Sequence, residues 1–232
     1  MIKLMQGDCL DRMKEIDSGS VDMILADPPY GTTQNKWDSI IPIEPMWEQL
    51  KRIINPSGAI VFTASQPFTS VLISSNLKDF KYCWYWKKNR ATGVLNAKRQ
   101  PLRNVEDICV FNVKQYNPQG LIECNTPSRN SKKDYDNYGK GTNKEYTQKY
   151  TNYPKQVLEF DSIQRTVHPT QKPVSLMEYM IKTYTNEGDT VLDFTMGSGS
   201  TGVAAKNLNR SFIGIELDQG YFEIARERIN NA

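Results

Sequence analysis

The stretch Thr190-Val191-Leu192-Asp193-Phe194-Thr195-Met196-Gly197-Ser198-Gly199-Ser200-Thr201-Gly202 connects an expected strand over 190–194 to an expected helix over 201–208. Its glycines fit the spacing G-x-G-x-x-G, which lets a ligand approach backbone amides at a helix N-terminus. Glu216 follows after the next expected strand, where an acid can accept hydrogen bonds from ribose hydroxyls. The pattern predicts a nucleoside-containing cofactor, either NAD or S-adenosylmethionine. A tight turn without a ligand is the alternative.

Strands and helices alternate on both sides of this loop. The remaining expected strands cover 2–5, 21–26, 58–63, 82–86, 107–111 and 211–215, and the expected helices cover 8–18, 43–54, 67–78, 173–185 and 218–230. This alternation predicts an α/β fold with a doubly wound, mostly parallel sheet. Residues 114–165 are rich in Asn, Lys, Tyr, Gln and Ser and show no sustained period. We expect one domain from residues 1–113 and 166–232, carrying a loop-rich insertion over 114–165.

Composition argues against a secreted protein, a membrane protein, a disulfide-bonded scaffold and a zinc protein. The chain has 232 residues, a formal net charge of +3, one histidine (His168) and four cysteines without metal-type spacing. No apolar run approaches the length of a membrane span, and the first residues do not resemble a signal peptide. We therefore expect a cytoplasmic protein with free thiols, no bound metal and no membrane segment.

Basic residues are unevenly distributed. Residues 81–103 contain seven Lys and Arg side chains and no Asp or Glu. Such a segment on an otherwise acidic chain favours contact with a polyanion, although a solvated face is the alternative. The predicted phosphate contacts are Lys87, Lys88, Arg90, Lys98, Arg99 and Arg103. At least two of the nearby Tyr82, Trp84, Tyr85 and Trp86 are expected to pack in the core, and stacking on nucleic acid is the alternative for the others.

A second motif follows the apolar run 21–26. Asp27-Pro28-Pro29-Tyr30 lies where the predicted strand ends, and ligands of open α/β sheets bind beyond the C-terminal ends of the strands. Two prolines leave carbonyl acceptors without N–H donors, flanked by a carboxylate and an aromatic ring. This set suits an amino group whose ring stacks on Tyr30. A rigid turn at the end of the strand is the alternative.

With these motifs the sequence resembles the amino-group DNA methyltransferases. Asp27-Pro28-Pro29-Tyr30 is similar to their catalytic motif, and residues 193–199 are similar to their cofactor loop. His168-Pro169-Thr170-Gln171-Lys172-Pro173 resembles a third motif, which holds the methionine end of the cofactor. The order of the motifs is circularly permuted and resembles the beta class. The resemblance implies a Rossmann-like, S-adenosylmethionine-dependent methyltransferase fold.

The resemblance also implies an activity and a set of site residues. It implies methyl transfer from S-adenosylmethionine to N6 of adenine in double-stranded DNA, with N4 of cytosine as the lesser option. The catalytic residues would be Asp27, Pro28, Pro29 and Tyr30, and the cofactor-binding residues Asp8, Cys9, Asp27, Lys172, Phe194, Thr195, Gly197, Ser198, Gly199 and Glu216. Asp8 has a helix N-cap as its alternative role, and Lys172, expected to pair with the cofactor carboxylate, has a solvated side chain as its alternative.

The insertion lies where the resembling family carries a target-recognition region. Because it is short and polar, we expect either loose sequence specificity or recognition shared with a second subunit, which makes a homodimer one expected assembly. Other functions left open are an NAD-dependent oxidoreductase, a non-catalytic nucleic-acid-binding module, and an enzyme acting on RNA or protein. Restriction–modification, phage self-protection and housekeeping methylation are all compatible with the residues.

Overall fold

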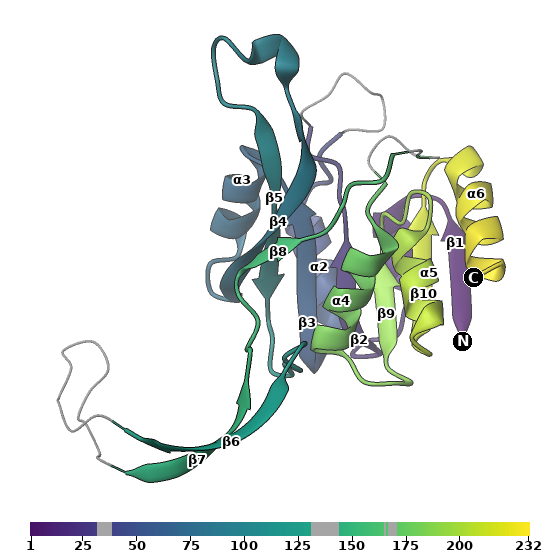
Figure 1. Ribbon diagram of the computed structural model, residues 1–232. Helices are drawn as coiled ribbons and strands as arrows, with labels where there is room; N and C mark the ends of the chain where they lie inside the picture. Colours follow the sequence, from purple (N-terminus) through teal and green to yellow (C-terminus); the bar gives the residue numbers. More distant parts are fainter. Residues whose placement is uncertain (32–38, 131–143, 165, 167–170) are drawn as a thin grey trace. The chain divides into compact units, whose positions relative to one another are not determined.

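The computed structural model describes residues 1–31, 39–130, 144–164, 166 and 171–232 (Figure 1). It divides into two compact units. The first comprises Met1–Asn117 and Gln156–Ala232, and the second comprises Pro118–Lys155. The cofactor loop and the Asp27 motif both lie in the first unit, which we describe first.

The described part of the first unit contains an eight-stranded sheet. Its spatial order is β1 (Ile2–Gln6), β10 (Ser211–Glu216), β9 (Thr190–Asp193), β2 (Val21–Ala26), β3 (Ile54–Ala64), β5 (Arg103–Phe111), β4 (Phe80–Thr92) and β8 (Val157–Glu159). The first five strands are parallel, β5 is antiparallel to both β3 and β4, and β8 is parallel to β4. The predicted mostly parallel, doubly wound sheet is confirmed.

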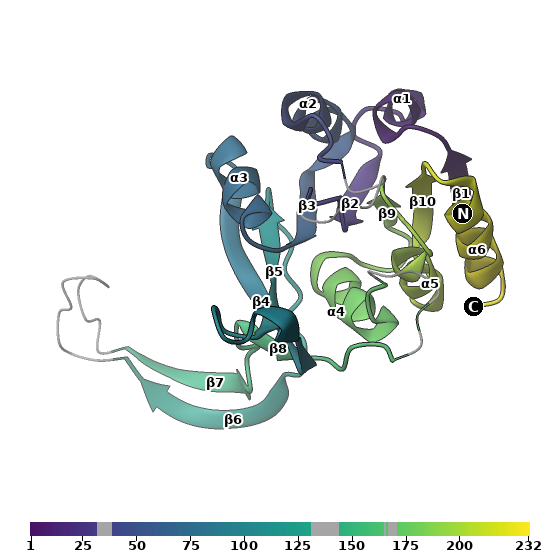
Figure 2. The ribbon, with the colours of Figure 1, turned by 90° about the horizontal axis from the view of Figure 1, so that it is seen from above.

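Helices cover both faces of this sheet, so the unit has three layers (Figure 2). One face carries α1 (Cys9–Arg12), the short 3₁₀ helix η1 (Met13–Glu15), α2 (Ile43–Ile53) and α3 (Phe68–Ser75). The other face carries α4 (Val174–Tyr184), α5 (Ser200–Asn207) and α6 (Gln219–Asn230). Because both faces are covered, residues 23–26 of β2 and 59–62 of β3 form continuous buried apolar runs rather than alternating patterns. None of the helices in the described ranges is long and apolar enough to cross a membrane.

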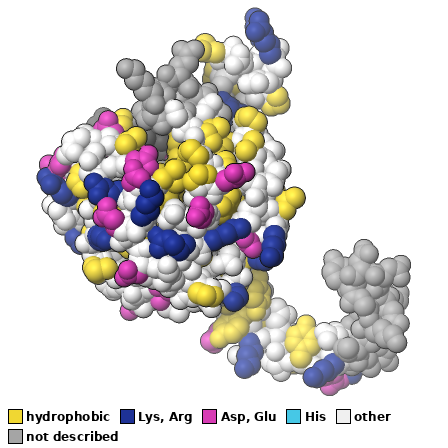
Figure 3. Space-filling view, turned by 180° about the vertical axis from the view of Figure 1, so that it is seen from behind, with side chains coloured by type: hydrophobic (Ala, Val, Ile, Leu, Met, Phe, Trp, Pro, Cys, Tyr) yellow, Lys and Arg dark blue, Asp and Glu magenta, His cyan; other side chains and the backbone are white. Residues whose placement is uncertain are grey.

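The hairpin of β4 and β5 extends past the ends of the neighbouring strands (Figure 1). Its tip holds the 3₁₀ helix η2 (Val94–Asn96), where Val94 and Leu95 are exposed. Basic and hydrophobic side chains lie together on this projection, at the top of the view in Figure 3. Both strands are longer than expected, because their polar outer halves give no apolar signal in the sequence.

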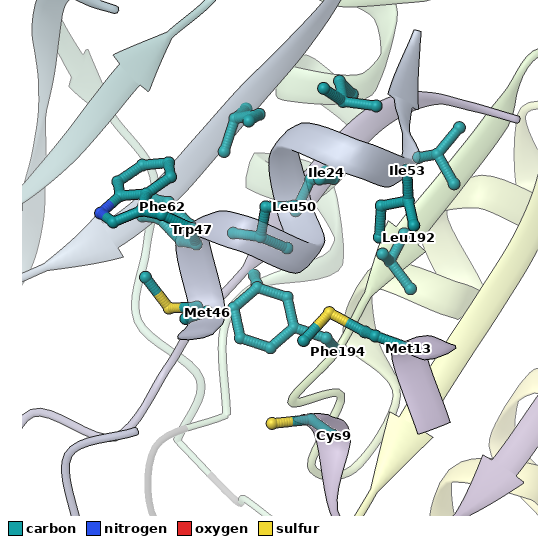
Figure 4. Packing of buried hydrophobic residues seen from close by; sticks show 14 of the residues in the cluster. Cys9, Met13, Ile24, Met46, Trp47, Leu50, Ile53, Phe62, Leu192 and Phe194 are labelled. Atoms are coloured by element: carbon teal, nitrogen blue, oxygen red, sulfur yellow. The ribbon is translucent and has the colours of Figure 1, made fainter. Parts of the chain in front are cut away.

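Apolar side chains pack on each face of the sheet. On the α2 face, Trp47, Leu50 and Ile53 pack against Phe62 and Phe194 from the strand side (Figure 4). Trp47 meets the Phe62 ring edge-on, with a centroid distance of 5.7 Å, a favourable geometry for aromatic pairs. This packing holds the segment that follows β9 against the sheet, and that segment carries the glycine loop.

The order of the strands explains where a site can form. At the boundary between β9 and β2 the winding reverses, because β9 is followed along the chain by β10 on one side, whereas β2 is followed by β3 on the other. Such a switch point leaves a crevice at the C-terminal ends of the strands. Residues that follow β2, β9, β10 and β1 therefore meet there, although they are far apart in the sequence.

Other expected boundaries also differ in the structure. In place of the single helix expected over 8–18, α1 ends at Arg12 and the chain continues only as a 3₁₀ turn. β3 begins at Ile54 rather than at the expected residue 58, because Ile54 pairs with Val21 before a register shift. The large sheet also resumes earlier than expected, with β8 falling inside the range 114–165.

The second unit, Pro118–Lys155, contains an antiparallel ribbon of β6 (Ile122–Arg129) and β7 (Glu145–Thr151). Residues 122–129 and 145–151, which lie inside the range expected to be loop-rich, therefore form strands. The two strands are mostly exposed, so they carry no alternation of apolar and polar residues that a sequence reading could detect.

Candidate active site

The C-terminal strand ends surround a cavity of about 810 Å³ in the first unit. This volume lies in the range of ligand and cofactor pockets. Most of the residues predicted to act in catalysis or cofactor binding line it: Asp8, Cys9, Asp27, Pro28, Pro29, Tyr30, Lys172, Phe194, Thr195, Gly197, Ser198 and Glu216. His168, Pro169 and Thr170 of the third motif lie outside the described residues.

The glycine loop is held by Glu216. Gly197 has a positive φ of 51°, and its N–H donates to Glu216 Oε2 at 2.8 Å. Glu216 Oε1 accepts a second backbone hydrogen bond, from Asp218 N–H at 2.9 Å. Burial raises the pKa of Glu216 above its ordinary value. The carboxylate is thus oriented by two amides while it lines the cavity, where it can accept hydrogen bonds from a ligand.

Gly199 has a different position from the one predicted. It does not line the cavity, and a Cβ at this residue would come within 3.0 Å of the Ala225 side chain on α6. Its φ of 80° also lies in the left-handed region that favours glycine. The structure therefore assigns Gly199 to close packing of the loop on α6 rather than to ligand contact.

Asp193 ends β9 beneath this loop and is 3% exposed. Its Oδ1 accepts from Thr195 N–H at 3.1 Å. Burial is the main reason that its pKa is raised to about 7, with the negative charges of Asp27 and Glu216 adding to the effect. Two nearby buried hydroxyls, Thr195 Oγ1 and Ser200 Oγ, make no hydrogen bond with the described part of the chain. Both residues line the cavity, so these hydroxyls are available to a polar ligand.

Asp8 and Cys9 follow β1 and also line the cavity. Asp8 is the N-cap of α1, because its Oδ1 accepts from Leu10 N–H at 2.8 Å. It also lines the cavity, so capping and ligand contact do not exclude each other. Burial raises the pKa of Cys9 to about 12, which keeps the thiol neutral. The Cys9 side chain therefore lines the cavity without carrying a charge.

The Asp27 carboxylate lies at the centre of a polar cluster. Its Oδ1 accepts from the Tyr30 hydroxyl at 2.5 Å and from the Thr63 hydroxyl. Its Oδ2 accepts from Lys172 Nζ at 2.5 Å. These contacts join the end of β2, the end of β3 and the segment before α4, so the carboxylate is held from three sides.

Tyr30 is fixed by both its hydroxyl and its ring. The ring stacks on Phe68 of α3, with a centroid distance of 5.4 Å and an interplanar angle of 23°. Burial and the neighbouring Asp27 raise the pKa of the Tyr30 phenol well above its ordinary value. Because Phe68 covers one face of the ring, a base can stack only on the other face.

Lys172 is buried, so a solvated side chain is the wrong interpretation. Burial by itself would lower its pKa, but the carboxylates of Asp27 and Glu106 outweigh burial and raise the pKa. The Glu106 carboxylate also accepts from Lys88 Nζ. Lys88, predicted to contact phosphate, is therefore occupied within the protein. Lys87, also on β4, pairs with Glu159 at 2.7 Å.

The other four predicted DNA contacts, Arg90, Lys98, Arg99 and Arg103, are exposed on the β4–β5 hairpin. Trp84 and Trp86 of β4 are buried, which agrees with the core packing expected for two of the aromatic residues. Sequence reasoning missed Thr63, Phe68 and Glu106. Each lies at or near the end of a predicted strand or helix, and that position was the available signal.

Comparison with known proteins identifies the family. A family model described as a DNA methylase matches residues 21–227, which is most of the chain. The chain belongs to the DNA methylase family. The resemblance seen in the motifs is confirmed.

Two relatives of this methylase align over nearly its whole length. The type II methyltransferase M.HpaI of Haemophilus parainfluenzae is 29% identical, and the alignment covers 99% of this chain and 74% of that protein. The DNA adenine methyltransferase YhdJ of Escherichia coli (strain K12) is 30% identical, with 99% and 83% covered.

Solved structures agree with the fold of the methylase. The structure of the M1.HpyAVI–SAM complex has a TM-score of 0.67 and 27% identity, covering 98% of this chain and 100% of that one. The PvuII DNA methyltransferase, described as cytosine-N4-specific, has a TM-score of 0.72 and 14% identity, covering 98% and 86%. At that identity the second likeness concerns the fold alone.

Proposed function

We propose that this methylase transfers a methyl group from S-adenosylmethionine to the N6 amino group of adenine in DNA. The observation that carries the proposal is the Asp27 carboxylate, held by three side chains at the edge of the cavity that the glycine loop lines. Relatives named as DNA adenine methyltransferases support adenine as the target.

The residues around the cavity fit S-adenosylmethionine. Glu216 would accept hydrogen bonds from ribose hydroxyls, and Asp193 would balance a cationic group. The Thr195 and Ser200 hydroxyls, which find no partner in the described chain, would bond to the ligand. A solved complex of M1.HpyAVI with the same cofactor supports this choice. When bound, the cofactor supplies a methyl group made electrophilic by its sulfonium centre.

The task of Asp27 follows from the chemistry of the substrate. The exocyclic amine of adenine is a weak nucleophile because its lone pair is delocalised into the ring. An acceptor for each N–H favours the pyramidal geometry in which the lone pair is available. The Asp27 carboxylate and the Pro28 carbonyl would act as these acceptors. Their interaction with the nitrogen strengthens as it gains positive charge, so it favours the transition state over the ground state.

The base must leave the duplex before it reaches Asp27, which costs a few kcal/mol. Stacking on the face of the Tyr30 ring opposite Phe68 would recover about 1–3 kcal/mol of this cost. The contact with Phe68 keeps that ring in one orientation, so little further ordering is needed when the base arrives.

The DNA backbone would be contacted by the exposed Arg90, Lys98, Arg99 and Arg103 of the β4–β5 hairpin. The expected target-recognition region, residues 114–165, includes the β6–β7 ribbon, whose exposed side chains can hydrogen-bond to base edges. Recognition shared by two subunits is our proposal for how so short a region specifies a site. All four cysteines are free thiols, which fits the proposed cytoplasmic location.

The proposed function is tested by expressing the chain in a host that lacks adenine methylation and digesting its DNA to nucleosides. Mass spectrometry should detect N6-methyladenine with the wild-type chain. Asp27→Ala should abolish the product while cofactor binding, measured by calorimetry, stays within about threefold. Asp17→Ala, at an exposed aspartate that does not line the cavity, is the matched control. N4-methylcytosine as the main product would overturn the choice of adenine, and no methylated base would overturn the activity.

A further inference from the structure

Four charged side chains alternate in sign from Asp27 into the sheet. Lys172 Nζ lies 2.5 Å from Asp27 Oδ2 and 3.7 Å from Glu106 Oε2. Glu106 Oε1 in turn accepts from Lys88 Nζ. The side chains of Lys172, Glu106 and Lys88 are 8%, 17% and 16% exposed, so solvent screens these charges weakly.

The contacts of Asp27 limit what it can offer to a substrate. A carboxylate has about four lone-pair directions, and the hydroxyls of Tyr30 and Thr63 together with the Lys172 ammonium already occupy three. An arriving amine competes most directly with Lys172, which is bound to Oδ2. Full access to Oδ2 therefore requires Lys172 to move to another acceptor.

Glu106 provides that acceptor. Its Oε2 is buried and accepts no hydrogen bond from any described residue. The separation of 3.7 Å from Lys172 Nζ exceeds a hydrogen bond by about 1 Å. A buried oxygen without a partner costs free energy, so a short movement of Lys172 toward Glu106 would satisfy it. Glu106 does not line the cavity, so it acts on the reaction through its contact with Lys172 rather than by touching the substrate.

We propose that Glu106 is a positioning residue that takes the Lys172 ammonium from Asp27 when the target amine arrives. The movement frees Asp27 Oδ2 to accept an N–H of the base. The ammonium stays between the two carboxylates, so the buried charge remains balanced throughout. This inference rests on the proposed function, because the target amine is the group that Asp27 receives.

Glu106→Gln tests the inference, because glutamine keeps the size of the side chain and one acceptor oxygen but removes the charge. At saturating DNA and cofactor, the single-turnover rate of methyl transfer should fall at least tenfold. The dissociation constant of S-adenosylmethionine, measured by calorimetry, should stay within twofold because Glu106 does not line the cavity. Glu187→Gln makes the same chemical change at an exposed loop position and should keep the wild-type rate.

Two further measurements separate positioning from structural support. Without the Glu106 charge, Lys172 should lose its proton at a lower pH, shifting the alkaline limb of the rate profile downward by about half a unit or more. The double variant Lys88→Met/Glu106→Gln removes one charge of each sign and should remain as slow as Glu106→Gln. A structural role predicts that the double variant recovers the wild-type rate with an unshifted profile.

The outcomes distinguish this inference from the proposed function. Wild-type protein that methylates DNA, together with a Glu106→Gln rate within twofold of it, overturns the inference alone. Recovery of the wild-type rate in the double variant also overturns it. Wild-type protein that binds S-adenosylmethionine but methylates no DNA overturns the proposed function and the inference with it.

Discussion

Replacing Asp193 by asparagine should stabilise the ligand-free protein, and the gain should grow with pH. The pKa of this buried carboxyl is raised from 3.8 to about 7 in the folded chain. As the pH rises, Asp193 therefore loses its proton in the unfolded chain at a lower pH than in the folded chain. The stability that comes from the bound proton is complete below about pH 4 and is lost as the pH rises through 7. The cost of carrying this acid rather than a neutral group reaches about 2 kcal/mol at pH 5 and about 4 kcal/mol at pH 8.

The asparagine side chain introduced by Asp193→Asn is neutral and retains an acceptor oxygen for the Thr195 N–H, so the variant does not carry this pH-dependent cost. The free energy of unfolding of Asp193→Asn relative to wild type should thus increase by about 2–3 kcal/mol from pH 5 to pH 8. This corresponds to a growth of roughly 5–10 °C in the Tm difference for a domain of this size. Urea unfolding and thermal scans of the ligand-free proteins at both pH values measure the difference. Asp17→Asn, at an exposed site, should track wild type at both.

The same carboxyl predicts how cofactor binding responds to pH. A cationic ligand prefers the ionised form, so the affinity of the wild-type chain for S-adenosylmethionine should increase from pH 5 to pH 8. In Asp193→Asn the affinity should be weaker and nearly independent of pH. A stability difference between variant and wild type that is equal at both pH values would refute the reasoning, because it would mean that Asp193 does not titrate between them.

Three other changes test separate parts of the site. Glu216→Ala should weaken S-adenosylmethionine binding about tenfold or more by calorimetry, since it removes a ligand acceptor and leaves the Gly197 N–H without its partner; wild-type affinity would contradict this. Lys98→Ala/Arg99→Ala should flatten the slope of log K for DNA against log salt by about two units, and an unchanged slope would make the hairpin a solvated face. Thr63→Val removes one hydrogen bond to Asp27 and should slow methyl transfer about fivefold with cofactor affinity unchanged. A wild-type rate would mean that the Thr63 hydroxyl is not needed to hold the carboxylate.

The motifs and the alternation of strands and helices could be predicted from the sequence because their signals are local. An apolar run such as Val21–Ala26 indicates a buried strand, and the glycines after Asp193 indicate a loop that opens a helix. Because the C-terminal ends of parallel strands lie at the same edge of the sheet, a residue that follows such a strand is expected at that edge. Asp27 and Glu216 are therefore expected at the same crevice, and both line the cavity there.

Only the tertiary structure decided which side chains meet in that crevice. Lys172 pairs with Asp27 and faces Glu106, because β2, β3 and β5 are neighbours in the sheet. Phe68, the first residue of α3, covers a face of the Tyr30 ring because it meets the segment that follows β2. These pairings join residues tens of positions or more apart, and their distances depend on strand order, register and side-chain direction. No local pattern encodes those three quantities, so the sequence by itself determined the types of residue in the site, whereas the packed sheet determined their partners.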